Sequence, residues 1–166
     1  MKKIIVFGLL LSQGFFTSCT VNDNPQPITK EFLAEVFEVK ADFTSANTYR
    51  NFYKLNPVIF NSDVLLLYEN AGVDKAGADI WKGLPQVYTS VDGIHQYNFD
   101  FTKSDFSIFL DSNFDPLKLN SKWRLNKIFR IVVVPGKFSN TIDKSNLQNV
   151  MNKLNLNEKS VVDLSN

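Results

Sequence analysis

The sequence is poor in the residues from which enzymes most often build reactive centres, with one cysteine and one histidine in 166 residues. A single cysteine excludes an intramolecular disulfide framework, and zinc sites assembled from several Cys and His ligands are excluded with it. Any Ser–His–Asp site would have to use His95. His95 follows an Asp-Gly turn, so we expect a partly exposed neighbour in a cross-strand pair and no catalytic role.

Neither the charged residues nor the glycines form a pattern that indicates a nucleic-acid or phosphate site. The chain has 18 Lys+Arg against 17 Asp+Glu, so it lacks the general basic field that a nucleic-acid partner needs. None of the seven glycines opens a helix, which excludes a phosphate-binding loop. The longest uncharged apolar run near the start, residues 4–11, is too short to span a bilayer of about 30 Å as a helix.

The first nineteen residues have the layout of an export signal. Lys2 and Lys3 precede the apolar run, and Thr17-Ser18 supplies small residues directly before Cys19. We therefore predict a signal peptide at residues 1–18 and a polar tether at 19–30. An ordinary secretory signal that ends by chance at a cysteine is the alternative.

Phe16-Thr17-Ser18-Cys19 resembles the lipobox of bacterial lipoproteins, which has Leu where this chain has Phe16. The resemblance implies lipidation, with a diacylglyceryl group on the Cys19 sulfur and cleavage in front of it. Two or three acyl chains hold a protein permanently on a membrane. The expected location is the bacterial cell envelope, at the outer membrane, and the periplasmic and surface faces both stay open. Apart from this covalent lipid we expect no cofactor.

The remaining chain favours β-structure, since Phe, Tyr and Trp are abundant and several segments alternate polar and apolar residues. The predicted strands are Val36–Phe43, Thr48–Leu55, Val64–Tyr68, Asp79–Leu84, Val87–Val91, Ile94–Phe101, Phe106–Leu110 and Lys127–Val134. Asp92-Gly93 predicts a type I′ hairpin turn. We predict an all-β fold at residues 31–138, an antiparallel β-sandwich with an immunoglobulin-like Greek key.

The last part of the chain differs from the rest. Apolar residues at helical spacing predict an amphipathic helix at Ser145–Leu154 that Ser145 caps, and Val161-Val162 adds a short extended piece. A helix this short must dock on something, so we expect residues 139–166 to pack on the same domain.

Two groups of residues are candidates for binding. A basic stretch around Trp123 is either a solvated face or a contact for anionic lipid or glycan phosphate; it comprises Lys118, Lys122, Arg124, Lys127 and Arg130. Trp81, Tyr88 and Tyr97 predict either an aromatic platform for sugar or peptide or ordinary core packing. The predicted binding surface consists of Trp81, Trp123, Lys122 and Arg124.

Catalytic and metal patterns are weak. Residues 111–115 open like a calcium loop, but Pro116 and Lys122 stand where Gly and Glu are needed, so we interpret the segment as a turn. A hydrolase is conceivable only if Asp100, Asp105 and Asp111 converge, with or without His95. We assign no catalytic, cofactor-binding or metal residues.

Three segments, residues 79–86, Tyr97–Thr102 and Phe129–Pro135, resemble a family of small, flavobacterial-type lipoproteins from the Bacteroidota. The resemblance runs from about Glu35 to Leu154 and implies location and kinship, not activity. Our hypothesis is a noncatalytic, lipid-anchored module that binds a protein or glycan partner. The alternative is a small carboxylate-based hydrolase of the envelope.

Overall fold

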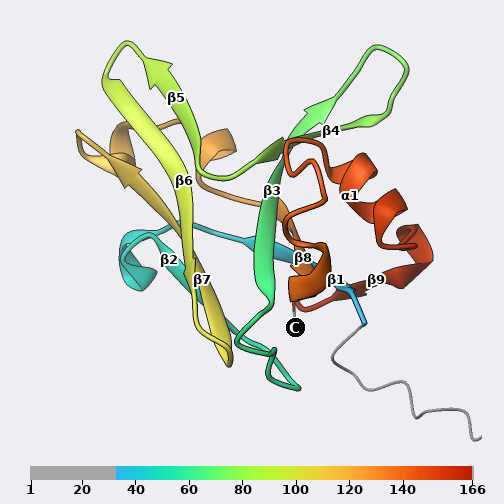
Figure 1. Cartoon of the computed structure of the whole chain (residues 1–166). Helices are drawn as coiled ribbons and strands as arrows, with labels where there is room; N and C mark the ends of the chain where they lie inside the picture. Colours follow the sequence, from blue (N-terminus) through green and yellow to red (C-terminus); the bar gives the residue numbers. More distant parts are fainter. Residues whose placement is uncertain (1–32, 166) are drawn as a thin grey trace, which may run out of the picture.

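The computed structural model describes residues 33–165. The predicted signal peptide, Cys19 and the predicted tether lie outside the described residues. Two β-sheets pack face to face, and a short helix with the C-terminal segment covers the outer face of one of them (Figure 1). The predicted all-β sandwich is confirmed.

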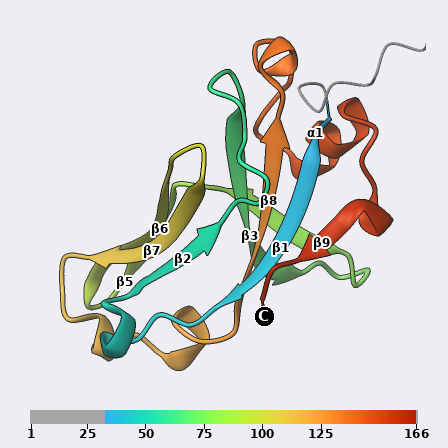
Figure 2. The ribbon, with the colours of Figure 1, turned by 90° about the horizontal axis from the view of Figure 1, so that it is seen from below.

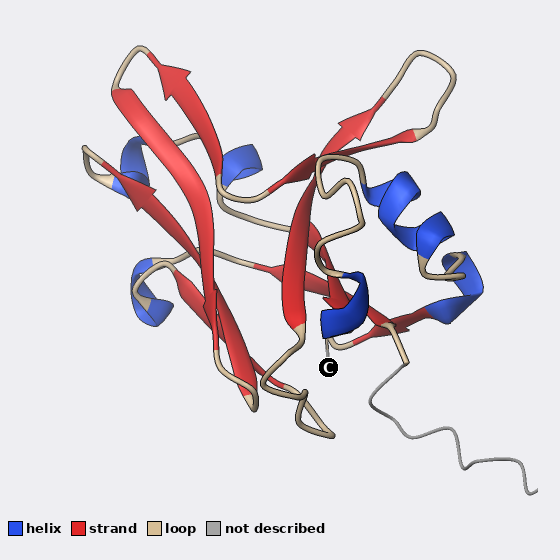
Figure 3. Cartoon of the chain, in the orientation of Figure 1, coloured by secondary structure: helices blue, strands red, loops and turns tan. Residues whose placement is uncertain are grey.

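We call the two sheets A and B. Sheet A has the order β4-β3-β8-β1-β9, and sheet B the order β2-β7-β6-β5. Figure 3 distinguishes the strands of the two sheets from the short helices and the loops that join them. The strands of sheet A are β1 (Glu35–Ala41), β3 (Val64–Val73), β4 (Asp79–Gly83), β8 (Lys127–Val134) and β9 (Val161–Asp163). Those of sheet B are β2 (Arg50–Lys54), β5 (Gln86–Ser90), β6 (Gly93–Phe101) and β7 (Asp105–Ser112). All pairs are antiparallel except that of β9 with β1.

The helices are short. Helix α1 spans Leu147–Lys153, and the 3₁₀ helices are η2 (Ser45–Asn47), η3 (Pro116–Lys118), η4 (Ser121–Trp123), η5 (Gly136–Phe138) and η6 (Glu158–Ser160). Asn146 caps α1, because its Oδ1 accepts a hydrogen bond from the Asn149 amide at 3.0 Å. The predicted cap was wrong, since Ser145 instead donates to Asp143. Within residues 33–165, the helices are too short to cross a bilayer.

Strand β8 separates two hydrophobic cores. Successive side chains of a strand point to opposite faces. Phe129 and Ile131 therefore belong to the core between the sheets, whereas Val132 and Val134 belong to a second core under α1. Figure 2 shows the resulting layers, with sheet B, sheet A and the helical segment side by side. The sandwich thus has a covered outer face on sheet A.

Pairing lengthens two strands beyond their predicted ends. We expected loops from Asn70 and from Asp111, but β3 continues to Val73 beside β4, and β7 continues to Ser112 beside β6. Backbone hydrogen bonds to a neighbouring strand hold these residues extended, which is a tertiary effect that local propensity does not report.

The β5–β6 hairpin forms where expected but with a different turn. Ser90 and Gly93 form its last pair, so Val91 and Asp92 are the two turn residues. Of the three residues 91–93, Gly93 alone has a positive φ, of 137°, so the predicted type I′ turn was wrong. Glycine is required there, since a Cβ would lie 2.3 Å from Oδ1 of Asn113.

Candidate functional site

A pocket of about 600 Å³ lies between the β3–β4 hairpin, β5, η4 and the start of β8, at one end of the sandwich. Figure 1 shows the β3–β4 hairpin and β5 diverging at this end. Its walls come from three parts of the chain: residues 69–82 on β3 and β4, Tyr88 on β5, and residues 122–128 on η4 and β8. We call it the Trp123 pocket. Its volume lies in the range of small-ligand sites, so it is the first place to look for binding.

Glu69 forms the floor of the Trp123 pocket. It continues the inward-facing series of Leu65 and Leu67, and its side chain is 0 % exposed. Lys127 Nζ lies 2.8 Å from Glu69 Oε1, and the Tyr88 hydroxyl donates to Oε2 at 2.8 Å. A buried carboxylate needs such partners, because leaving it unpaired would cost several kcal/mol.

The inner wall of the pocket is aromatic. The Tyr88 and Trp123 rings are 4.7 Å apart between centroids, at 52°. Tyr97 lies beneath them and donates a hydrogen bond from its hydroxyl to the Trp123 carbonyl, which holds η4 against sheet B. Burial and the hydrogen bond to Glu69 raise the pKa of Tyr88 above its ordinary value, so its hydroxyl stays protonated and remains a donor.

His95 is buried behind this wall, with 1 % of its surface exposed, so the predicted partly exposed position was wrong. Its ring stacks on Tyr88 at 5.5 Å and meets Trp123 edge-on at 5.0 Å. Neither ring nitrogen has a hydrogen-bond partner among the residues that the structure describes. Burial lowers the pKa of His95, with Lys127 lowering it further and Glu69 opposing, so the imidazole is held neutral.

Two lysines flank the mouth of the pocket. Lys82 Nζ lies 5.0 Å from the centre of the Tyr88 ring, and Lys122 Nζ lies 5.4 Å from that of Trp123. Within residues 33–165 neither ammonium forms an ion pair. The lining carboxylate not paired with a cation is Asp79, which accepts a hydrogen bond from Asn70. The mouth therefore carries a positive excess.

The structure divides the predicted binding surface. Trp123 and Lys122 line the pocket, but Trp81 packs in the core under α1, on the other face of sheet A. Arg124 points elsewhere, since its Nε donates to the Leu119 carbonyl at 3.2 Å. The platform of Trp81, Tyr88 and Tyr97 does not form, because the Tyr97 ring is buried within the sandwich.

The predicted basic stretch is not one solvated face. Arg130 is buried, and its guanidinium forms ion pairs with Glu38 at 2.7 Å and Glu158 at 2.8 Å. It also lies 4.4 Å from the Trp81 ring, at the wall of a second cavity of about 280 Å³. Lys127 points to the opposite face, where it pairs with Glu69.

The acids proposed for a hydrolase lie apart. Asp100 is on the outer face of sheet B, bound to Arg50 at 2.7 Å and accepting from the Ser107 hydroxyl. Asp111 pairs across the strands with Gln96, on that same outer face, whereas His95 points inward. Asp105 accepts hydrogen bonds from the Thr102 and Ser104 hydroxyls in the β6–β7 turn. This arrangement holds the acids in local contacts.

The calcium-like segment is only partly the turn we expected, since Asp111 and Ser112 end strand β7 and the chain bends at Asn113 and Phe114. Asn113 Oδ1 accepts from the Ile94 amide at 2.9 Å, and Asp115 Oδ1 accepts from the Leu117 amide at the start of η3. The part of the chain that the structure describes holds no cluster of three or more His, Cys, Asp or Glu side chains suited to a metal ion.

Sequence reasoning did not identify Glu69 or Lys82 as site residues. The available signal was the parity of the strands: Leu65, Leu67 and Glu69 share one face of β3, as Lys127 and Phe129 share one face of β8. An acid and a lysine at inward positions of adjacent strands indicate a buried pair.

Comparison of the chain with protein-family models, with curated protein sequences and with solved structures found no match. The resemblance to Bacteroidota lipoproteins therefore stays a prediction.

Proposed function

We propose that this chain is a noncatalytic module of the bacterial cell envelope that is anchored by a lipid on Cys19 and binds an acidic saccharide of a glycan in the Trp123 pocket. One observation carries the binding proposal. Two aromatic rings and two ammonium groups free of ion pairs within residues 33–165, those of Lys82 and Lys122, converge on one cavity.

The chemistry of the pocket suits an anionic sugar. Aromatic rings such as those of Tyr88 and Trp123 offer flat apolar surfaces against which the C–H face of a pyranose can pack. Ammonium groups attract carboxylate or phosphate substituents, and Lys is well suited to this because it acts as a compact point charge. Asn70, Asp79 and Asn126 add polar atoms at the rim for sugar hydroxyls.

The contacts of Glu69 favour binding over hydrolysis. A general acid must contact the leaving group of the substrate. Both carboxylate oxygens of Glu69 are instead engaged by protein groups, Oε1 by the Lys127 ammonium at 2.8 Å and Oε2 by the Tyr88 hydroxyl at 2.8 Å. This pairing supports a structural role for Glu69 beneath the bound ligand.

Calorimetric titration tests the binding proposal with a short oligomer of galacturonic acid and its methyl-esterified, neutral counterpart. We expect the acidic oligomer to bind more tightly, and its affinity to fall as salt rises. Lys82→Gln and Lys122→Gln should each weaken binding by up to about fivefold, since each removes one partly exposed charge contact.

Lys75→Gln is the matched control, because Lys75 is exposed at the distal tip of the β3–β4 hairpin. Equal affinity for the acidic and neutral oligomers would overturn the proposal, as would no binding of either or an equal loss on Lys75→Gln.

The anchor is tested separately by mass spectrometry of the protein from envelope fractions. A mature chain that starts at a diacylglyceryl-modified Cys19 supports it, and a bare sulfhydryl or an uncut leader contradicts it.

A further inference from the structure

The end of the sandwich opposite the Trp123 pocket is where the chain enters the described structure. Leu33 precedes β1, whose Glu35 pairs with Val133 near the end of β8. Strand β8 begins beside the pocket at Lys127, and its eight residues extend about 26 Å. We call this opposite end the entry end.

Three loops meet at the entry end. The segment before β3 is bound to the β6–β7 turn, since the Ile59 amide donates to the Lys103 carbonyl at 2.9 Å. The same segment approaches η5, where the Gly136 amide donates to Asp63 Oδ1 at 3.3 Å. These contacts join loops from both sheets into one surface, which Figure 2 views from below.

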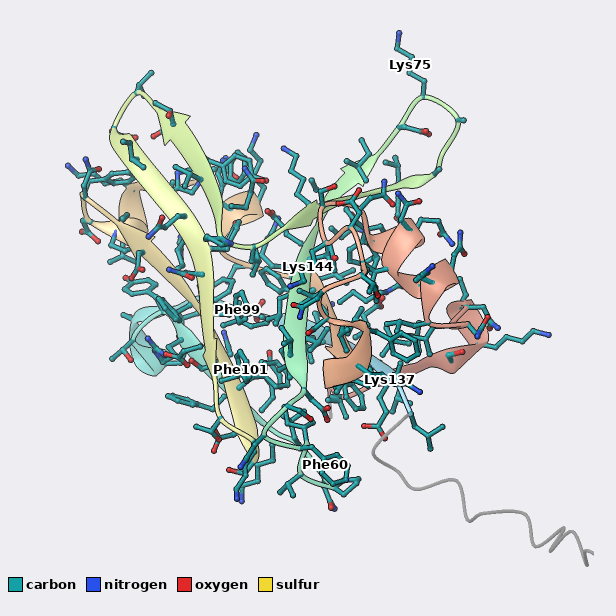
Figure 4. All side chains as sticks on the ribbon, in the orientation of Figure 1. Phe60, Lys75, Phe99, Phe101, Lys137 and Lys144 are labelled. Atoms are coloured by element: carbon teal, nitrogen blue, oxygen red, sulfur yellow. The ribbon has the colours of Figure 1, made fainter. Side chains whose placement is uncertain are left out.

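Large apolar side chains project from this surface. Leu33, Val58, Phe60 and Phe101 are each at least 41 % exposed, and Phe60 and Phe101 line one shallow depression. Figure 4 shows Phe60 at the entry end and Lys75 at the far end of the molecule. Exposed apolar residues gathered on one face usually mark a contact surface.

The exposed charges around these residues are cationic. Lys54, Lys103 and Lys137 are exposed, whereas the acids at this end, Glu35, Asp63 and Asp105, are half-buried. Asp63 accepts hydrogen bonds from the Phe60 and Gly136 amides, and Asp105 accepts from hydroxyls of its own turn. Apolar side chains ringed by lysines suit the headgroup region of an anionic bilayer.

We infer that the entry end rests on the surface of the anchoring membrane, with Val58, Phe60 and Phe101 in the headgroup region. The inference rests on the proposed anchor at Cys19. From Cys19 to Leu33 the chain reaches at most about 50 Å when fully extended, and any shorter path brings this end towards the lipid first. The Trp123 pocket then faces away from the membrane, open to an envelope glycan.

Single-site spin labelling tests the orientation. The full-length protein is taken from envelope fractions and reconstituted in vesicles of phosphatidylethanolamine and phosphatidylglycerol. Phe60→Cys and, as the matched control, Lys75→Cys are labelled with a nitroxide, and collisions with oxygen and with a water-soluble nickel complex are measured. We expect the label at position 60 to favour oxygen and the label at position 75 to favour nickel.

Equal nickel accessibility at the two positions would overturn the inference, and so would a label at position 60 that is shielded from both reagents, since that indicates a protein contact. The parent protein reports the anchor independently. Cys19 is its only cysteine, so labelling of the parent means a bare thiol and removes the anchor itself. A protein that resists labelling and shows no preference at position 60 keeps the anchor and loses only the orientation. Circular dichroism of both variants checks that the fold is retained.

Discussion

Lys127 and Arg130 lie three residues apart on β8, yet they serve opposite faces of sheet A. Lys127 points between the sheets, where it pairs with a carboxylate that is 0 % exposed. Arg130 points under α1 and pairs with Glu38 and Glu158, which are 32 % and 70 % exposed. Both cations have acidic partners, and Arg130 is buried whereas the Lys127 side chain is 12 % exposed. The two sites differ in what happens to the acid when its cation is removed. Glu38 and Glu158 are partly exposed and can be hydrated, whereas Glu69 would stay buried without a partner.

This difference in the exposure of the acidic partners corresponds to two different roles of the cations. The Lys127–Glu69 pair neutralises the floor of the Trp123 pocket and must stay intact for the aromatic wall above it to remain in place. Arg130 instead joins β8 to β1 through Glu38 and to the C-terminal segment through Glu158. One pair supports a binding site, and the other fastens the tail of the chain to the sandwich.

Removing Lys127 should have the largest effect. Lys127→Met leaves Glu69 buried without its cation, which should lower the free energy of unfolding by about 3–5 kcal/mol. Urea unfolding at pH 7 measures it. The double variant with Glu69→Gln should recover part of this loss, because no charge is then left buried without a partner.

Lys122→Met is the control. At this exposed position the substitution should change the free energy of unfolding by less than about 0.5 kcal/mol. A loss on Lys127→Met no greater than that on Lys122→Met would remove the distinction between the two pairs.

Removing Arg130 should cost less. Arg130→Met deletes two charged hydrogen bonds, but Glu38 and Glu158 remain in contact with water, so we expect a loss of about 1.5–3 kcal/mol. The loss should concentrate in the C-terminal segment. In hydrogen-exchange measurements, Arg130→Met should therefore accelerate exchange, relative to the wild type, more in β9 and α1 than in β6. Uniform acceleration across both sheets would contradict the proposed fastening role.

Lowering the pH should destabilise the fold through His95, which lies beside the Trp123 pocket. Its pKa is lowered by burial and by Lys127 against the opposing effect of Glu69, so the unfolded chain binds the proton more readily. Stability should then fall as the pH drops below the ordinary histidine pKa of about 6.5. His95→Phe keeps an aromatic ring and should lose less stability than the wild type between pH 7.5 and 5.5 in urea unfolding. Parallel losses in the two proteins would assign the acid sensitivity to other groups.

The smallest effect is expected at the tail. Glu158→Gln removes a 2.8 Å ion pair whose carboxylate is mostly solvated, so the cost should be about 0–1 kcal/mol and should vanish at high salt. Glu38→Gln, on the less exposed partner, is the comparison and should cost more. The reverse order, measured in a double-mutant cycle with Arg130→Met, would show that exposure does not rank these contacts.

Local patterns predicted the strands well and the site poorly. The bounds of β8 were predicted as observed, because the segment is rich in β-branched residues and Pro135-Gly136 ends it. Strand β6 begins one residue before its predicted start, and its alternation of polar and apolar residues is a property of the segment itself. Along β8, the alternation of side-chain direction splits the basic stretch, sending Lys127 and Arg130 to different faces. His95 was misjudged because a hairpin shoulder is buried when another segment covers it, as η4 does here.

By itself, the sequence determined that this chain forms short alternating strands and a small amphipathic helix, since side-chain period and turn chemistry are local. Only the tertiary structure decided that Glu69, Tyr88 and Trp123 share one pocket, because strand order brings together residues up to 54 positions apart in the chain. Pairing β3 with β8 and laying η4 over β5 creates that neighbourhood. No single segment contains all three residues, so the position of Glu69 on the pocket floor follows only from the way the two sheets pack together.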